Sequence, residues 1–166
     1  MSTNFLQMFE TDPKELENYI KQIKSYEEQL DIIEQSVEKE KELEKSHPSW
    51  ELVLWTGIAG VHFHVDLHSE EGVRLINSLK SGVELKLVRE PNNKFDRWAI
   101  AIYTRKDEML GYMTRYKNET IARLMDGGYV FHAFVEDRLQ TNFQVPKEQR
   151  AFTENFNIPY SVWMER

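Results

Sequence analysis

The sequence contains no cysteine and no run of 18 apolar residues. Without cysteine the chain cannot form disulfides, zinc ribbons or a thiol nucleophile, and this absence fits a reducing cytosol. The first residues lack the basic and apolar layout of a secretory signal peptide. We therefore expect a cytoplasmic protein that has no membrane partner.

Motifs of common catalytic sites are missing as well. No serine lies in a G-x-S-x-G sequence, and no G-x-x-x-x-G-K-[ST] loop is present to bind phosphates. Acidic residues are abundant in the N-terminal third, where a solvated helix face accounts for them. The sequence therefore predicts a protein that is not an enzyme and needs no cofactor.

The net charge of −7 is unevenly distributed along the chain. Residues 1–51 carry 13 acidic and 6 basic side chains, whereas residues 52–166 carry 15 of each sign. The larger part is therefore neutral and lacks the broad positive field of a general polyanion binder. If this part binds nucleic acid, it must do so through a local site.

A chain of 166 residues, 40% of them hydrophobic and 12% aromatic, supports one folded domain with an appendage. Asp12-Pro13 is a good helix start, and the segment Ser46-His47-Pro48-Ser49 ends the helical pattern. We expect a flexible N-terminus at 1–12, a long acidic helix at 13–46, a linker at 47–51 and a folded domain at 52–166.

The expected N-terminal helix carries apolar residues that are separated alternately by three and four positions. This is the spacing of a coiled-coil seam, and it comprises Leu16, Tyr19, Ile23, Tyr26, Leu30, Ile33 and Val37. The pattern stops there, because Glu40 and Glu44 occupy the next two seam positions. About three heptads are near the lower limit for self-association. A helix that packs onto its own domain explains the pattern equally well.

Short strand-like segments fill the rest of the chain. Strands are expected at 52–60, 83–89, 97–104, 109–113, 129–136 and 160–164. One helix is expected after Ser69 and a second from Asn118, whereas 138–157 is expected to form a long loop. The predicted fold is mainly β (α+β): a compact six-stranded barrel with two short helices, preceded by the long helix.

Residues 61–67 alternate between apolar and polar side chains, which indicates a further strand. His62, His64 and Asp66 would then share one face, and His68 follows. Three metal ligands must converge within about 2.0–2.2 Å of one ion, whereas a straight strand separates residues i and i+4 by roughly 13 Å. We therefore expect surface or pocket histidines and no metal. A metal-dependent hydrolase that uses these residues is the third-ranked functional hypothesis.

The motif REPNNKFDRWAI, which joins two expected strands, contains more polar side chains than a turn needs. One explanation is structural: Asn93 and Asp96 can bond to nearby backbone, and Phe95 can fold into the core. The other is a binding pocket, because Arg115 follows the next Gly-Tyr strand end and belongs to a second polar loop. The residues alone leave both explanations open.

Two blocks of the sequence resemble the HIRAN domain family. LVREPNNKFDRWAIAIYT and LGYMTRYKNETIARLMDGG match its pattern L-x-R-x-P-x-N-x-x-D-x-x-A-I-x-V, followed by G-Y/H-L/V-x-R/K and an I-A-x-L-M/L-D helix. Both blocks come in the right order and at the right separation, and the resemblance covers roughly residues 52–164. It implies an OB-like β-barrel with two helices, here in a free-standing protein like those of bacteria and phages.

The resemblance also implies a function. In Swi/Snf-type fork-remodelling ATPases, HIRAN domains capture the 3′ end of single-stranded DNA. Aromatic residues enclose the terminal base, an asparagine and an aspartate reach the free 3′-hydroxyl, and basic residues hold phosphates. Transfer by position places Phe95 at a stacking tyrosine, Asp96 at the hydroxyl-binding aspartate and Asn93 at the neighbouring asparagine. Arg115 falls on a basic position that faces phosphate.

The segment GVHFH resembles the family's G-x-R-Y-Y stretch. This match places Phe63 at the second stacking position and His62 at a phosphate-contacting arginine. Phenylalanine keeps the stacking face, whereas a histidine that is neutral at pH 7 binds phosphate less well than arginine.

We therefore expect a non-catalytic module that binds single-stranded DNA, preferentially at free 3′-OH ends, in DNA repair or replication. The helix at 13–45 would dimerise it or dock it to a larger enzyme. The alternative is a protein-interaction adaptor that has lost DNA binding.

Overall fold

The structure is a computed structural model that describes residues 13–136 and 158–166. The expected flexible N-terminus and the whole of the expected long loop lie outside the described residues. The elements, in chain order, are α1 (Pro13–Ser46), β1 (Trp50–Gly57), α2 (Val61–His64), α3 (Glu70–Ser78), β2 (Glu84–Arg89), β3 (Ile100–Thr104), β4 (Met109–Tyr112), α4 (Arg115–Asp126), β5 (Val130–Val135) and β6 (Pro159–Glu165).

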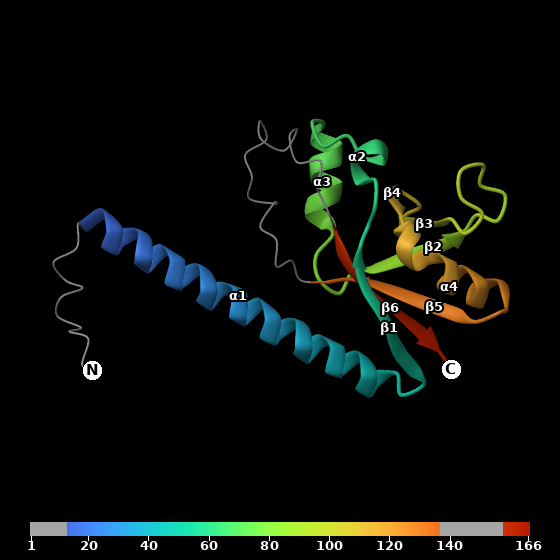
Figure 1. Ribbon diagram of the computed structural model, residues 1–166, viewed down its shortest axis with the longest axis horizontal. Coiled ribbons are helices and arrows are strands. Elements are labelled where there is room, and N and C mark those ends of the chain that lie inside the picture. Colours follow the sequence, from blue (N-terminus) through green and yellow to red (C-terminus); the bar gives the residue numbers. More distant parts are fainter. Residues whose placement is uncertain (1–12, 137–157) are drawn as a thin grey trace.

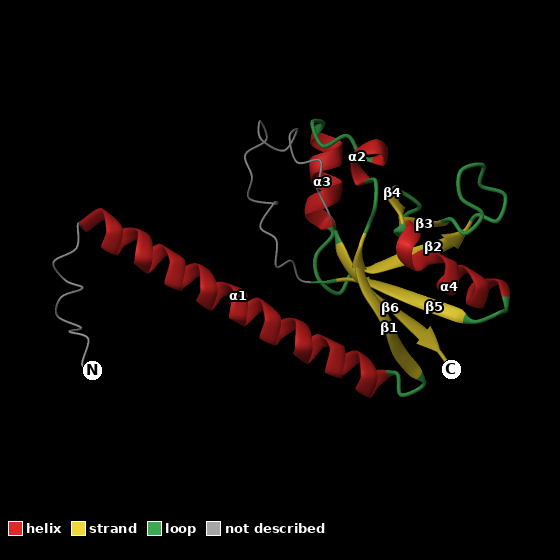
Figure 2. Ribbon diagram, viewed as in Figure 1, coloured by secondary structure: helices red, strands yellow, loops and turns green. Residues whose placement is uncertain are grey.

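The six strands form one antiparallel sheet in the order β1-β6-β5-β2-β3-β4 (Figure 2). The two edge strands of this sheet meet just beyond the end of β1. There Ala59 and Tyr112 exchange backbone hydrogen bonds, with N–O distances of 2.8 and 3.0 Å. The bridge closes the sheet into a small barrel. The predicted mainly β, OB-like, six-stranded fold preceded by a long helix is thus confirmed.

The core lies inside this barrel and under two of the helices. Three of the five residues of β3 are β-branched, and nearly all of its side chains are buried, as expected for an inner strand of the sheet. Ile76 of α3 and Ile121 of α4 are also buried and join the same core. Ser69 caps α3 as predicted, because its hydroxyl oxygen accepts a hydrogen bond from the Gly72 N–H at 2.9 Å.

The strand predicted at 61–67 is wrong, because the segment begins with the helical turn α2. Val61 and Val65 are buried, as the alternating pattern had indicated, whereas Phe63, which the same pattern placed on their face, is 79% exposed. However, a spacing of four residues brings two side chains to one side of a helical turn as well as to one face of a strand. Gly60, whose φ of 76° is left-handed, directs the chain into the turn.

Three further elements start at least two residues from their predicted positions. Strand β1 begins at Trp50, within the expected linker at 47–51, and ends at Gly57. Strand β3 begins at Ile100 because Arg97 and Trp98 belong to a turn, which the Ala99 N–H closes by donating to the Asp96 carbonyl at 3.0 Å. Helix α4 begins at Arg115. The asparagine predicted to open this helix is instead buried within its first turns.

Helix α1 is present as predicted and extends away from the barrel (Figure 1). Its seam side chains are 41–66% exposed at Tyr19, Ile23, Tyr26, Leu30, Ile33 and Val37. Within the described part of the chain, the seam is therefore not packed onto its own domain. No described helix combines the length and the apolar character needed to cross a membrane.

The junction between α1 and the barrel is a stack of three rings. Trp50 lies between His47 and His132, with ring centroids 3.8 Å apart on each side. The Trp50 N–H also donates to the His47 carbonyl at 2.8 Å, and the Arg166 N–H donates to the Ser49 carbonyl at 2.8 Å. These contacts fix the last residues of the helix segment against β1, β5 and the end of β6.

Closure of the barrel requires a glycine at position 111. A Cβ at Gly111 would lie 2.4 Å from the Ala59 carbonyl oxygen, so Gly111→Ala must push apart the strands that the Ala59–Tyr112 bridge joins. We expect Gly111→Ala to lower the free energy of unfolding by about 1–3 kcal/mol more than Gly128→Ala does. Gly128 is the matched control because it also has a positive φ, whereas its Cβ would meet no atom within 4 Å. Urea denaturation measures both, and equal losses would contradict the clash.

Candidate functional site

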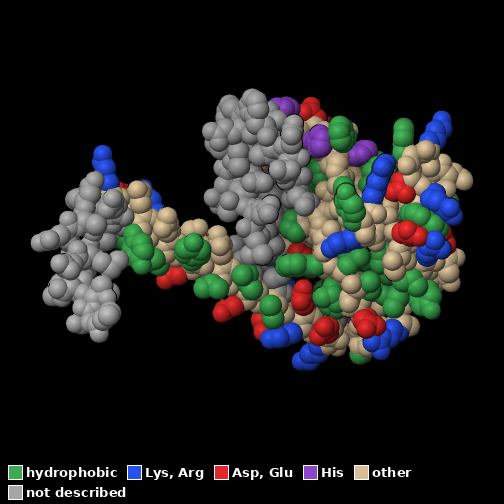
Figure 3. Space-filling view, viewed as in Figure 1, with side chains coloured by type: hydrophobic (Ala, Val, Ile, Leu, Met, Phe, Trp, Pro, Cys, Tyr) green, Lys and Arg blue, Asp and Glu red, His purple; other side chains and the backbone are tan. Residues whose placement is uncertain are grey.

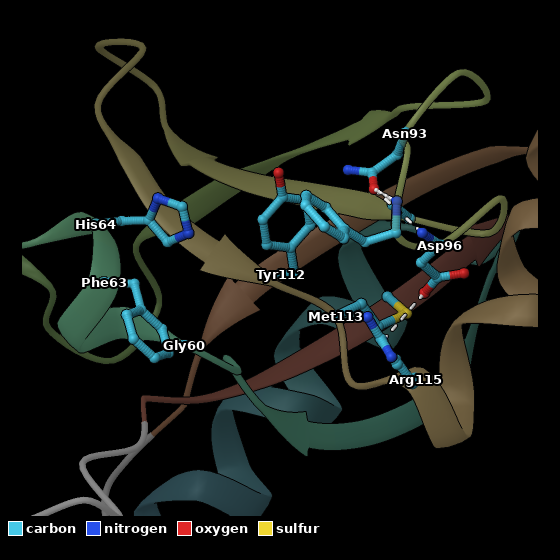
Figure 4. Close-up of a pocket in the computed structure, with 10 residues that line it drawn as sticks. Gly60, Phe63, His64, Asn93, Asp96, Tyr112, Met113 and Arg115 are labelled. Atoms are coloured by element: carbon cyan, nitrogen blue, oxygen red, sulfur yellow. Dashed lines mark hydrogen bonds and ion pairs between the residues drawn. The ribbon is translucent and has the colours of Figure 1, made fainter.

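An open pocket of about 780 Å³ lies between α2, the β2–β3 connection and the start of α4 (Figure 4). Its lining residues are Gly60, Phe63, His64, Asn93, Phe95, Asp96, Ala99, Tyr112, Met113 and Arg115. Five of the six residues predicted as binding residues are among them. The exception, His62, does not line the pocket. The volume is in the range of small-molecule sites, which is roughly 300–1,000 Å³.

The β2–β3 connection consists of two successive turns that are built around one asparagine. The Asn93 N–H closes the first turn on the Glu90 carbonyl at 3.1 Å. The Asn93 side-chain oxygen then accepts from the N–H groups of Phe95 at 2.9 Å and Asp96 at 3.1 Å. Asn93 therefore shapes the loop itself, as asparagine does in many turns.

Asp96 links this connection to α4. Its Oδ1 accepts from the Trp98 N–H at 2.8 Å, and its Oδ2 accepts from the side-chain amide of Asn118 at 2.7 Å. Asn118 is only 2% exposed, so Asp96 satisfies a buried donor. The Asp96 carboxylate is thus fixed in orientation, and each of its oxygens retains further acceptor capacity.

Arg115 is the basic residue at the pocket. Its Nε lies 3.9 Å from the Asp96 Oδ2, which is too long for a hydrogen bond, and its side chain is largely exposed. The guanidinium group can therefore donate to an anion in the pocket while it stays close to the carboxylate. Figure 4 shows Arg115 beside Asp96 on the side of the pocket opposite His64.

Tyr112 forms the wall between the two sides of the pocket (Figure 4). Its hydroxyl donates to the Glu90 Oε2 at 3.1 Å, and the Asn93 side-chain amide donates to the same oxygen at 2.8 Å. Burial first, and then the bond to Glu90, raise the pKa of Tyr112, so the phenol stays neutral near pH 7. This network ties β4 to the β2–β3 connection.

Two phenylalanine side chains are exposed at the pocket. Phe63 is 79% exposed and Phe95 is 86% exposed, so Phe95 does not fold into the core. Fully burying such a side chain is worth about 1.5–3 kcal/mol, which makes two exposed phenylalanines at one pocket informative. They offer aromatic faces for a ligand.

The histidines of α2 do not converge. His62 lies against Phe63, with ring centroids 3.9 Å apart, whereas the His64 ring lies 5.6 Å from the Tyr112 ring in an edge-on arrangement. In a helical turn, the side chains at positions i and i+2 point in nearly opposite directions. Within residues 13–136 and 158–166, no three histidine, aspartate, glutamate or cysteine side chains come together as a metal site requires.

Six residues of the site were not predicted. Gly60, His64, Ala99, Tyr112 and Met113 line the pocket, and Asn118 positions Asp96. Tyr112 could have been found, because it is the tyrosine of the Gly-Tyr strand end. The role of Asn118 was hidden, because asparagine near a helix start is usually a capping residue.

The pocket thus combines aromatic faces, a fixed carboxylate and a guanidinium group. Such a set suits a ligand that has a planar ring, a hydroxyl donor and a nearby anionic group. The lining contains no serine, threonine, cysteine or lysine that could act as a nucleophile beside a base.

Comparison with known proteins supports this assignment of fold and family. The HIRAN domain family model matches residues 54–149. The crystal structure of a protein from Lactobacillus plantarum has a TM-score of 0.52 and 23% identity, covering 70% of this chain and 97% of that chain. The crystal structure of the HIRAN domain of human HLTF has a TM-score of 0.48 and 15% identity, covering 72% of this chain and 82% of that chain. No curated protein matched. Because the family model matches more than half of its residues, the chain belongs to the HIRAN domain family.

Proposed function

We propose that the barrel captures single-stranded DNA at its free 3′ end, in DNA repair or replication, and catalyses no reaction. The main observation is that Phe63 and Phe95 are exposed at the same pocket that contains Asp96 and Arg115. Stacking on an aromatic face contributes about 1–3 kcal/mol per base and is tolerant of sequence. Family membership supports the same ligand class.

Asp96 supplies the preference for an end. A carboxylate repels an internal phosphodiester, whereas it accepts a hydrogen bond from a terminal hydroxyl. The bonds from Trp98 and Asn118 hold the Asp96 carboxylate in place, so it does not turn away from an unsuitable ligand. A strand that continues past the pocket would therefore place a phosphate near a fixed negative charge.

Arg115 is the residue that we assign to the phosphate of the terminal nucleotide. Its donors can reach an anion because its only described ion pair, with Asp96, is 3.9 Å long. His62 lies beside Phe63 and outside the pocket, so we assign it at most a secondary contact with the backbone. Since the region 52–166 is neutral, affinity should come mainly from stacking.

The preference for a hydroxyl end is best tested by changing the DNA. Fluorescence anisotropy should show that an oligonucleotide with a 3′-OH binds at least about tenfold more tightly than the same strand with a 3′-phosphate, or ~1.4 kcal/mol. The matched control is the same pair of groups at the 5′ end, which should bind equally. Equal affinity for both 3′ ends would refute end recognition.

A second function is favoured by one observation: the side-chain oxygens of Asn93 and Asp96 already serve the loop structure. A HIRAN barrel that kept these residues for folding alone could serve as a protein-interaction adaptor. Electrostatic attraction to DNA is strongest at low salt. Absence of oligonucleotide binding under these conditions would favour the adaptor. In both cases α1 is the element that we assign to assembly with another protein chain.

A further inference from the structure

The seam of α1 is exposed within the described part of the chain. Six of its side chains lie on one face of a helix of 34 residues, which is about 51 Å long at 1.5 Å per residue. Figure 3 shows hydrophobic side chains along α1 where it stands clear of the barrel. A helix that carries such a continuous apolar stripe usually buries it against another element.

The heptad positions of the seam can be assigned from its spacing. The a positions are Leu16, Ile23, Leu30 and Val37, and the d positions are Tyr19, Tyr26 and Ile33. Two of the four a positions, Ile23 and Val37, are β-branched, as is common in parallel two-stranded coiled coils. Glu40 and Glu44 follow at d and a, so a paired seam would end after Val37, before the barrel begins.

The charges beside the seam distinguish the two orientations of a helix pair. In a parallel pair, the g position of one helix faces the e position of its partner, which places Gln22 opposite Glu27 and Gln29 opposite Glu34. In an antiparallel pair, e faces e, which brings Glu27 of one copy next to Glu27 of the other when Ile23 lies opposite Ile33. Like charges at these positions destabilise the pair, whereas a glutamine can donate a hydrogen bond to a glutamate.

We propose that α1 forms a parallel two-stranded coiled coil with a second copy of this chain, and that the dimer presents two DNA-end pockets at the same end of the helix pair. The ring stack of His47, Trp50 and His132 fixes each barrel to the end of its helix. Parallel pairing therefore places both barrels together at one end, whereas antiparallel pairing would separate them by most of the helix length. The second half of the proposal rests on the proposed function.

The orientation of the two helices can be determined by oxidative cross-linking of single introduced cysteines, because the chain has no cysteine of its own. In a parallel dimer Ile23 faces Ile23 of the other copy, so oxidised Ile23→Cys protein should be cross-linked almost completely. In an antiparallel dimer this position would face one near Ile33, and only a mixture of Ile23→Cys and Ile33→Cys chains would cross-link. The second result would overturn the parallel arrangement.

The oligomeric state should be measured without DNA by sedimentation over a range of protein concentrations. The full chain should reach twice the monomer mass, and Ile23→Asp/Leu30→Asp should stay monomeric with its helix content reduced. The control Ser25→Asp/Gln35→Asp adds the same charges away from the seam and should dimerise normally. A monomeric wild-type chain at all concentrations would overturn the proposal and leave the seam for another protein or another segment of this chain.

Bivalent binding gives a separate measurement. Two strands joined through their 5′ ends carry two 3′-OH ends, and the dimer should bind them at least about tenfold more tightly than a single strand, since the second contact becomes intramolecular. Ile23→Asp/Leu30→Asp should lose this gain and keep its affinity for single strands. If the dimer binds the joined strands and the single strand with equal affinity, the proposal that its two pockets bind one ligand together is overturned. If neither ligand binds, the proposed function fails while the dimer stands.

Discussion

Replacing Phe95 with alanine is expected to weaken binding of a 3′-hydroxyl single strand by roughly 5- to 150-fold, which corresponds to the ~1–3 kcal/mol of one stacking face. The side chain is 86% exposed, so its removal should leave the free energy of unfolding nearly unchanged. The loss should be similar for all four terminal bases, because stacking does not read sequence. Fluorescence anisotropy at a fixed salt concentration measures it.

Tyr129→Ala is the matched control for this variant. Tyr129 is also an exposed aromatic residue, but it lies beyond the other end of α4 from Arg115. The Tyr129→Ala protein should bind DNA as tightly as the wild-type protein. The double variant Phe63→Ala/Phe95→Ala removes both faces and should lose more affinity than Phe95→Ala alone. Wild-type affinity in the double variant would exclude the pocket as the binding site.

Asp96→Ala is expected to destabilise the barrel by about 2–4 kcal/mol, because it leaves two hydrogen-bond donors without their acceptor. These are the Trp98 N–H and the buried side-chain amide of Asn118. The β2–β3 connection and the start of α4 would lose their link. Chemical denaturation measures the loss directly, and an unchanged midpoint would show that the loop does not depend on this carboxylate.

Asp96→Asn provides the conservative comparison. Its side-chain oxygen can still accept one of the two hydrogen bonds, so it should retain about half of the lost stability. Loss of DNA binding in Asp96→Ala cannot by itself be attributed to ligand contact, because the same substitution disturbs the loop that carries Phe95. For this reason the choice between 3′-OH and 3′-phosphate ends is the more decisive measurement of end recognition.

The long helix, the capped helix α3 and the β-rich order of elements were predictable because each rests on local signals. Ser69 followed by two acidic residues is such a signal, and so is the three–four spacing of the seam in α1. The turn α2 was not predictable in this way, since Val61 and Val65 satisfy both a strand and a helical period. Barrel closure decides between them, and closure depends on Tyr112, which lies far along the chain.

The site was predictable in its location and less so in its chemistry. The motif around Asn93, Phe95 and Asp96 was compatible with a structural turn or with a binding pocket. In the structure the turn itself forms part of the pocket wall. The sequence alone does not show that Asp96 both shapes the turn and lines the pocket. The orientation of its carboxylate depends on a hydrogen bond from Asn118, which belongs to helix α4. Contacts of these residues with bases and phosphates belong to the proposed function.

The position of β6 has a consequence for the order of folding. β6 follows the other five described strands in the sequence, yet it lies between β1 and β5, so Trp50 pairs with Glu165. The sheet therefore cannot be completed until residues 159–165 have been synthesised, and until then β1 and β5 each have an unpaired edge. Pairing across such long sequence separations is slow and exposes edges to aggregation. Helix α1 precedes all six strands in the sequence and is synthesised before them. Two nascent chains that pair through it would hold unfinished barrels side by side, where an exchange of β6 between them could compete with correct folding.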